Sequence, residues 1–124
     1  MSKPTVAIVG ASADPAKYGN RSIHAHLSQG YEVFPVNPKG GEIDGLIVYT
    51  SLAEVPVEHL NRISVYLPPA VGIEVIEQIA AKGCDELWLN PGSDAPEVLA
   101  RAHELGLEPI QACSIVDVMN RGGG

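Results

Sequence analysis

A repeated succession of helix, glycine and strand constrains this chain more than any other feature of its sequence. At Gly30, Gly83 and Gly106, a segment with helical spacing of apolar residues ends, and an acidic residue and an apolar run follow within a few positions. Such alternation is typical of βαβ units, whose right-handed crossovers give a parallel sheet with helices on both faces. The sequence therefore predicts an α/β fold, with a doubly wound sheet of about five mainly parallel strands.

Hydrophobic periodicity places the expected elements along the chain. Strands are expected at five short apolar runs: residues 5–9, 32–36, 63–67, 86–89 and 108–111. Helices are expected between them, at residues 20–29, 70–82 and 94–105, and a short extra strand at 46–49 after a turn at Asp44-Gly45. A chain of 124 residues suits one domain, for which we expect a core at residues 4–119 and a flexible tail at 120–124.

The first expected strand ends in a loop of small residues. Gly10, Ala11 and Ser12 follow the strand directly, and Lys17 and Tyr18 come just before the expected helix. A glycine turn between a strand and a helix aims backbone N–H groups and the helix N-terminus at a phosphate group. We therefore expect this loop to bind a nucleotide or a nucleotide-like cofactor, with an empty turn as the alternative.

This loop departs from the dinucleotide-binding pattern in two ways. Of the three glycines in Gly-x-Gly-x-x-Gly only Gly10 is present, because Ser12 and Pro15 stand at the other two positions. The second expected strand is followed by Asn37-Pro38-Lys39, where an NAD site carries an acidic residue for the ribose hydroxyls. A lysine at this place favours a ribose that bears a phosphate, as in NADP and coenzyme A.

The charge, the apolar runs and the cysteines of the chain argue against a nucleic-acid partner and against a membrane or secreted location. Its formal net charge is −7, so we do not expect a nucleic acid, which needs a basic face. Three of only eight Lys and Arg residues, namely Lys17, Arg21 and Lys39, lie near the expected strand ends, which suits one small anionic ligand. No apolar run is long enough for a membrane span, no signal peptide is recognisable and the two cysteines lie far apart, so we expect a cytoplasmic protein.

Three further loops follow expected strands and are therefore candidates for ligand contact. Leu67, Pro68 and Pro69 offer an apolar wall to an adenine or a pantetheine arm, and the turn Asn90-Pro91-Gly92 follows the next strand. Cys113 follows the last strand, either as an inert buried cysteine or as a reactive thiol. The histidines have no chelating spacing and no carboxylates are paired, so we expect neither a metal site nor catalytic residues.

Taken in order, these motifs resemble a known family over about residues 4–115. They are similar to the small stand-alone CoA-binding domain proteins of bacteria and to the CoA-binding part of the succinate–CoA ligase alpha subunit. The motifs that carry the resemblance are Val9-Gly10-Ala11-Ser12, Asp14-Pro15, Lys17-Tyr18-Gly19, Val36-Asn37-Pro38-Lys39, Ser51-Leu52, Pro68-Pro69, Trp88-Leu89-Asn90-Pro91-Gly92 and Cys113. The resemblance implies a Rossmann-like fold and coenzyme A or an acyl-CoA as the ligand.

The resemblance also implies roles for individual residues. The turn at residues 10–12 and Lys17 would hold phosphates, Lys39 would meet a phosphate near the adenosine, and residues 67–69 would flank the adenine or the pantetheine. The phosphohistidine of the ligase lies in a later domain, so no ligase activity is implied. We expect a CoA-binding protein without identified catalytic machinery. The alternatives are an NADP-binding oxidoreductase-like domain and a regulatory or partner subunit that senses CoA, and a homodimer stays open.

Overall fold

The computed structural model describes residues 3–122 and shows a central parallel sheet with helices on both faces. The sheet has four strands in the order β2-β1-β5-β6, and a separate antiparallel hairpin is formed by β3 and β4. In chain order the elements are β1 (Thr5–Val9), α1 (Tyr18–Ser28), β2 (Glu32–Val36), β3 (Glu42–Ile43), β4 (Leu46–Ile47), η1 (Leu52–Glu54), β5 (Leu60–Val65), α2 (Pro69–Lys82), β6 (Cys84–Leu89), α3 (Pro96–Glu104) and α4 (Ser114–Gly122).

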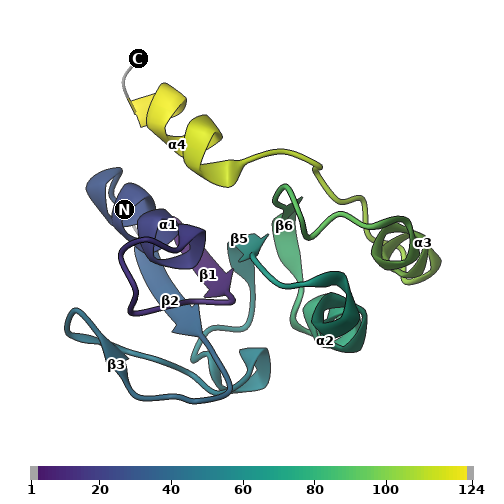
Figure 1. Cartoon of the computed structure of the whole chain (residues 1–124), viewed down its shortest axis with the longest axis horizontal. Coiled ribbons are helices and arrows are strands. Elements are labelled where there is room, and N and C mark those ends of the chain that lie inside the picture. Colours follow the sequence, from purple (N-terminus) through teal and green to yellow (C-terminus); the bar gives the residue numbers. More distant parts are fainter. Residues whose placement is uncertain (1–2, 123–124) are drawn as a thin grey trace.

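The strand order determines where the direction of strand addition reverses in the sheet. From β1 the chain first adds β2 on one side, and it later returns to add β5 on the other side. Helices α1 and α4 pack together on one face of the sheet, and α2 and α3 pack together on the other (Figure 1). The carboxyl ends of β1 and β5 therefore flank the topological switch point, which is where ligands of such sheets bind.

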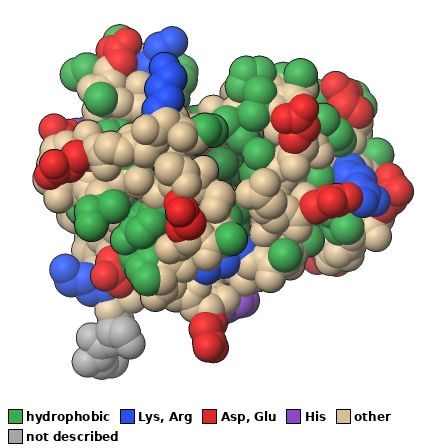
Figure 2. All heavy atoms as spheres, turned by 90° about the horizontal axis from the view of Figure 1, so that it is seen from below, with side chains coloured by type: hydrophobic (Ala, Val, Ile, Leu, Met, Phe, Trp, Pro, Cys, Tyr) green, Lys and Arg blue, Asp and Glu red, His purple; other side chains and the backbone are tan. Residues whose placement is uncertain are grey.

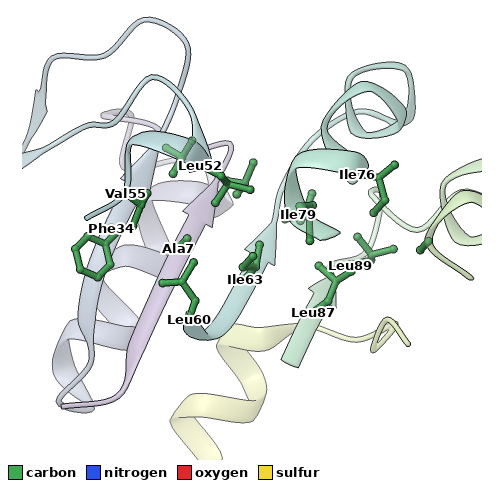
Figure 3. Packing of buried hydrophobic residues seen from close by; sticks show 14 of the residues in the cluster. Ala7, Phe34, Leu52, Val55, Leu60, Ile63, Ile76, Ile79, Leu87 and Leu89 are labelled. Carbon is green, nitrogen blue, oxygen red and sulfur yellow. The ribbon is translucent and has the colours of Figure 1, made fainter. Parts of the chain in front are cut away.

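Alternating side chains along β1 build the two parts of the core. Val6 and Ile8 face α1 and pack with Ile23, while Ala7 and Val9 face the other side of the sheet. On that second side, the side chains of all four strands of the sheet meet those of α2, α3 and η1 in one buried cluster (Figure 3). The period of two in a strand thus lets a single short run serve both layers.

The edge strand β2 has the predicted bounds and accommodates a proline. Pro35 has no N–H to donate, but its position faces the outer edge of the sheet, where its carbonyl accepts a hydrogen bond from Tyr49 N–H at 2.9 Å. β1 also has the predicted bounds, and the expected turn at Asp44-Gly45 joins β3 to β4 with positive φ at both residues.

Four strand predictions need correction. β6 begins at Cys84, two residues earlier than expected, and β4 ends at Ile47, two residues before its expected end. β5 begins at Leu60 and ends at Val65, three and two residues earlier than expected, because the polar Asn61 and Arg62 hid its start. The expected fifth strand is reduced to one bridge between Trp88 and Ile110. The neighbouring Pro109 cannot donate to a ladder, and the chain leaves the sheet after Ile110.

Helix α4 was not predicted. It runs from Ser114 to Gly122, so residues 120–122 belong to a helix and not to the expected tail, and residues 123–124 lie outside the described part of the chain. Its inner side is held by Arg62 of β5, which is only 1% exposed. Arg62 pairs with Asp117 of α4, its Nε lies 2.9 Å from Glu86 Oε1, and its guanidinium stacks 4.8 Å from the Trp88 ring centroid.

The buried His26 of α1 completes this arginine-centred cluster. Its Nδ1 lies 2.8 Å from the carbonyl oxygen of Ser22, and its Nε2 lies 3.4 Å from a guanidinium nitrogen of Arg62. Since Arg62 can only donate, Nε2 is the acceptor and the imidazole is neutral. Burial lowers the pKa of His26, the charge of Arg62 lowers it further, and the Ser22 carbonyl opposes them.

Two glycines allow close backbone contacts at the end of β1: Gly19, in the first turn of α1, approaches Gly10, and Gly10 approaches the segment after β5. A Cβ on Gly10 would lie 2.3 Å from the carbonyl oxygen of Tyr66, and a Cβ on Gly19 would lie 2.3 Å from the carbonyl oxygen of Gly10. Contacts this short are with backbone atoms, which cannot move aside cheaply. Gly10 also has a φ of +94°, which disfavours any other residue.

We predict that Gly10→Ala lowers the free energy of unfolding by about 3 kcal/mol or more, because it adds a backbone clash to a strained φ. Gly30→Ala is the matched control: Gly30 has a φ of +85°, but its Cβ would meet no atom within 4 Å. The control should cost only about 1 kcal/mol. Urea unfolding of both variants measures the difference, and equal losses would contradict the clash.

We also predict that the protein loses stability as the pH falls below about 6.5. The folded pKa of His26 is lower than its unfolded value of 6.5, so its contribution is complete above 6.5 and is lost as the pH drops toward the folded pKa. His26→Gln should flatten the pH dependence of the unfolding free energy between pH 7 and 5. His103→Gln, on the exposed side of α3, should keep the wild-type slope; a wild-type slope in His26→Gln would contradict the assignment.

Candidate functional site

Two cavities of different character meet at the carboxyl ends of β1 and β2. One has a volume of about 270 Å³ and is lined by polar and apolar groups in about equal measure, charged side chains among them: Ala11, Ser12, Ala13, Asp14, Asn37, Lys39, Gly40, Glu42, Ile43 and Val48. The other has a volume of about 130 Å³ and is mainly apolar: Val9, Gly10, Val36, Pro38, Thr50, Ser51, Leu52, Leu67, Val71, Val75 and Gln78. We call them the polar cavity and the apolar cavity.

The wall between the two cavities is made by two loops. Gly10 lines the apolar cavity and its neighbour Ala11 the polar one; likewise Pro38 lines the apolar cavity, and Asn37 and Lys39 line the polar one. Neighbours in sequence thus face opposite sides of the wall. The structure therefore brings together the residues predicted after the first and second strands.

The backbone of the first loop is partly used within the protein. The N–H groups of Gly10 and Ala11 both donate to the carbonyl oxygen of Val36, at 3.1 and 3.2 Å. In contrast, the N–H groups of Ser12 and Ala13 have no hydrogen-bond acceptor in residues 3–122. Of the predicted residues 10–12, only Ser12 therefore keeps an unbonded backbone donor, and Ala13, which was not predicted, adds a second.

The first turn of α1 adds further unbonded donors. The N–H groups of Tyr18, Gly19 and Asn20 have no acceptor inside the helix, because each would need a carbonyl before its start. Their dipoles favour a negative charge at this end of α1.

Lys17 and Tyr18 are exposed at the start of α1. Lys17 is the residue before the helix, and its backbone N–H donates to the carbonyl oxygen of Asp14. The Tyr18 ring is covered on one side by the guanidinium of Arg21, 5.3 Å from the ring centroid. Neither side chain lines the polar or the apolar cavity, so of the two predicted lysines only Lys39 lies in the cavity wall.

The loop after β5 contributes differently from what the sequence suggested. Leu67 lines the apolar cavity, whereas Pro68 and Pro69 form the start of α2 and do not line it. Their place in the cavity is taken by Val71 and Val75 of α2. Their helical spacing places the two valines on one side of α2, where Val71 is 40% exposed and Val75 is half-buried. Only the fold shows that this side of α2 borders a cavity.

Asn90 is committed to a buried polar network. Its amide nitrogen donates to Ser64 Oγ and to the carbonyl oxygen of Val65, and its Oδ1 accepts from the Ser114 N–H at 2.8 Å. Ser114 Oγ in turn lies 2.6 Å from Ser64 Oγ and 3.0 Å from the Tyr66 hydroxyl. This network fastens the start of α4 to the ends of β5 and β6, and sequence reasoning did not identify it.

The remaining predicted residues lie around this network. Pro91 and Gly92 form an exposed turn, and Cys113 is partly buried directly before α4, where its carbonyl oxygen accepts from Asp117 N–H. None of the three lines either cavity. The other cysteine, Cys84, begins β6 at the opposite edge of the sheet, and burial raises its pKa to about 11, which keeps its thiol protonated.

The surroundings of the site carry charge of both signs. Asp14 and Glu42 line the polar cavity with Lys39. On the face shown in Figure 2 the acidic side chains lie at several separate places, some of them beside Lys or Arg side chains. The net charge of −7 is therefore not concentrated in one patch on that face. Within residues 3–122, no helix combines the length and the apolar character that a membrane crossing needs.

Comparison with known proteins connects this site to a family. The chain is 36% identical to the alpha subunit of an ADP-forming acetate–CoA ligase from Pyrococcus furiosus, over 85 residues, or 64% of the chain. It is 32% identical over 82 residues to a trans-feruloyl-CoA synthase from an unknown prokaryote. The chain spans only 18% and 12% of the lengths of these two relatives.

Solved structures show the same fold, both as small proteins and within larger enzymes. A conserved hypothetical protein from Pyrococcus furiosus superposes with a TM-score of 0.83 at 38% identity, covering 92% of this chain and 98% of that one. A dinucleotide-forming acetyl-coenzyme A synthetase from Ca. Korarchaeum cryptofilum superposes with a TM-score of 0.74 at 27% identity, covering 86% of this chain and 25% of that one. The Rossmann-like fold is confirmed.

The family model described as a CoA binding domain matches residues 4–119, which is nearly the whole described chain. The relatives reported above whose species is named are archaeal, and a further solved structure of this fold, 27% identical, is from Thermus thermophilus, so the expected bacterial source stays a prediction. The resemblance drawn from the sequence motifs is confirmed: the chain belongs to the CoA-binding domain family.

Proposed function

We propose that this protein binds coenzyme A or an acyl-CoA across the wall between the polar and apolar cavities. The observation that carries the proposal is the meeting of these two cavities at residues 37–39 in a member of the CoA-binding domain family. A ligand with an aromatic base at one end and phosphates close by needs an apolar and a polar compartment side by side.

Hydrogen-bond donors for the phosphates lie around the polar cavity. The unbonded N–H groups of Ser12 and Ala13, and those of the first turn of α1, are oriented dipoles that favour an anion. Asp14 and Glu42 oppose an anion in the same cavity. The protein therefore depends on backbone donors close to the phosphate, whose short-range hydrogen bonds outweigh the exposed carboxylates further out.

Lys39 is placed to meet the phosphate on the ribose. It stands directly after β2, where a dinucleotide site recognises the ribose, and it lines the polar cavity. The apolar cavity beside it, with Pro38, Leu67, Val71 and Val75 in its wall, offers surfaces for the flat adenine ring. Pro38 and Lys39 would thus hold two adjoining parts of the same adenosine.

The comparisons favour CoA over NADP as the ligand with a phosphorylated ribose. The two curated relatives are named for CoA chemistry, as a CoA ligase subunit and a CoA synthase. In those proteins a domain of this kind forms a small part of a larger enzyme. A role as the CoA-holding partner of another chain is therefore the second candidate, and it uses the same site.

Lys39→Ala should weaken CoA binding roughly tenfold, about 1.4 kcal/mol, because an exposed charge-assisted contact to the 3′-phosphate is lost. Binding of dephospho-CoA, which lacks that phosphate, should change little. Isothermal calorimetry with CoA, dephospho-CoA and NADP measures all three affinities.

Lys3→Ala removes the same charge far from both cavities and serves as the control, with affinities within twofold of the wild type. Tight NADP binding without CoA binding would reject the proposed function. Equal losses for CoA and dephospho-CoA in Lys39→Ala would reject only the contact between Lys39 and the 3′-phosphate.

A further inference from the structure

We propose that Asn20 and Asn37 are positioning residues that orient two successive peptide groups of the loop after β1 toward an anion. The proposal rests on the proposed function and concerns how the same site recognises the phosphates common to CoA and dephospho-CoA. It assigns to these asparagines no ligand contact of their own.

Each asparagine amide holds one carbonyl of the loop. The Nδ2 of Asn37 donates to the carbonyl oxygen of Ala11 at 2.8 Å, and the Nδ2 of Asn20 donates to the carbonyl oxygen of Ser12 at 2.9 Å. The two donors come from opposite sides, since Asn37 follows β2 and Asn20 lies in the first turn of α1. Asn20 is only 3% exposed, so its amide has little freedom to turn away.

Holding these carbonyls fixes the directions of the next N–H groups. The carbonyl of Ala11 and the N–H of Ser12 belong to one rigid peptide plane and point in opposite directions, as do the carbonyl of Ser12 and the N–H of Ala13. These are the two loop N–H groups without an acceptor in the described chain. The asparagines therefore leave two consecutive donors oriented and unbonded.

Donors that are fixed before binding favour an anion without the entropy cost of ordering the loop. Ser12 is half-buried, so its unpaired N–H costs free energy in the empty protein and a ligand oxygen removes that cost, whereas Ala13 is exposed. An aspartate at position 37 could not serve in the same way, because an ionised carboxylate has no hydrogen to donate to Ala11. This gives a physical reason for an amide at the place where NAD sites carry an acid.

Asn37 has a second role through its other side-chain atom. Its Oδ1 accepts the backbone N–H of Lys39 at 2.9 Å, which closes the turn that carries the lysine. Asn37 thus connects the loop that faces the phosphates to the loop that carries Lys39. Asn20 has no contact with that second loop in the hydrogen bonds of the described residues.

The two roles of Asn37 can be separated by substitution. In Asn37→Ser the hydroxyl can still accept the Lys39 N–H but is too short to reach Ala11. We expect Asn37→Ser and Asn20→Ser each to weaken CoA and dephospho-CoA by the same factor, roughly tenfold, with the ratio of the two affinities unchanged. In Asn37→Ala, which also releases Lys39, the ratio should fall as it does in Lys39→Ala.

Asn120→Ser, on the exposed side of α4, is the matched control and should bind both ligands within twofold of the wild type. Calorimetry with CoA and dephospho-CoA reads the affinities, and thermal melting checks that each variant is folded. Wild-type affinity in both Asn20→Ser and Asn37→Ser would overturn the inference while leaving the proposed function intact. Absence of CoA binding by the wild type would reject the proposed function itself.

If a variant does not fold, the two asparagine hydrogen bonds can still be tested by a measurement on the wild-type protein. Scalar couplings across the hydrogen bonds from Asn37 Nδ2 to the Ala11 carbonyl and from Asn20 Nδ2 to the Ser12 carbonyl should be detectable by NMR in the ligand-free protein. If neither coupling is present and both side-chain amides exchange at the rate of free asparagine, the inference is wrong.

Discussion

The site depends on the contact between the backbones of Gly10 and Gly19. Gly10 has no Cβ that would strike the Tyr66 carbonyl after β5. The first turn of α1 reaches the end of β1 only because Gly19 has no Cβ, which would lie 2.3 Å from the carbonyl oxygen of Gly10. That approach brings Asn20 within hydrogen-bond distance of the Ser12 carbonyl. It also places the unbonded N–H groups of the helix next to those of the loop. The positive ends of both sets of peptide dipoles therefore attract an anion to the same place. A side chain at Gly19 would separate the helix from the loop before any ligand arrived, and one at Gly10 would strike the backbone after β5.

A second constraint operates on the far half of the sheet. Arg62 is buried in β5 and would be costly there without partners, so Glu86, Asp117 and the neutral His26 surround it. Burial acts to raise the pKa of Asp117, but the hydrogen bond and charge of Arg62 outweigh it and hold the pKa below its ordinary value. The cluster joins α1, α4 and two strands, and the network of Asn90 and Ser114 fastens the other end of α4.

Sequence reasoning identified most of the frame and only part of the site. The bounds of β1 and β2 followed from short apolar runs with glycine on one side and proline on the other, which are local signals. The start of β5 and the whole of α4 did not, because both depend on Arg62 being buried through partners that lie far apart in the chain. Asn37 and Lys39 were found as strand-end residues, but Asn20 was missed, since a helical asparagine gives no sign of a carbonyl within its reach. Pro68 and Pro69 were expected to face the ligand, whereas in the fold they begin α2 and leave that surface to Val71 and Val75.

The edge of the sheet at β2 has a consequence for how copies of this chain meet at high concentration. An open edge strand offers alternating donors and acceptors that can template a strand from another molecule. Here Pro35 removes one outward donor, and Tyr49 occupies its carbonyl and the N–H of Asn37. The outward backbone donors and acceptors of β2 are therefore too few in succession to pair with a strand from another molecule. This disfavours aggregation through β2 without adding charge to the edge that carries the site.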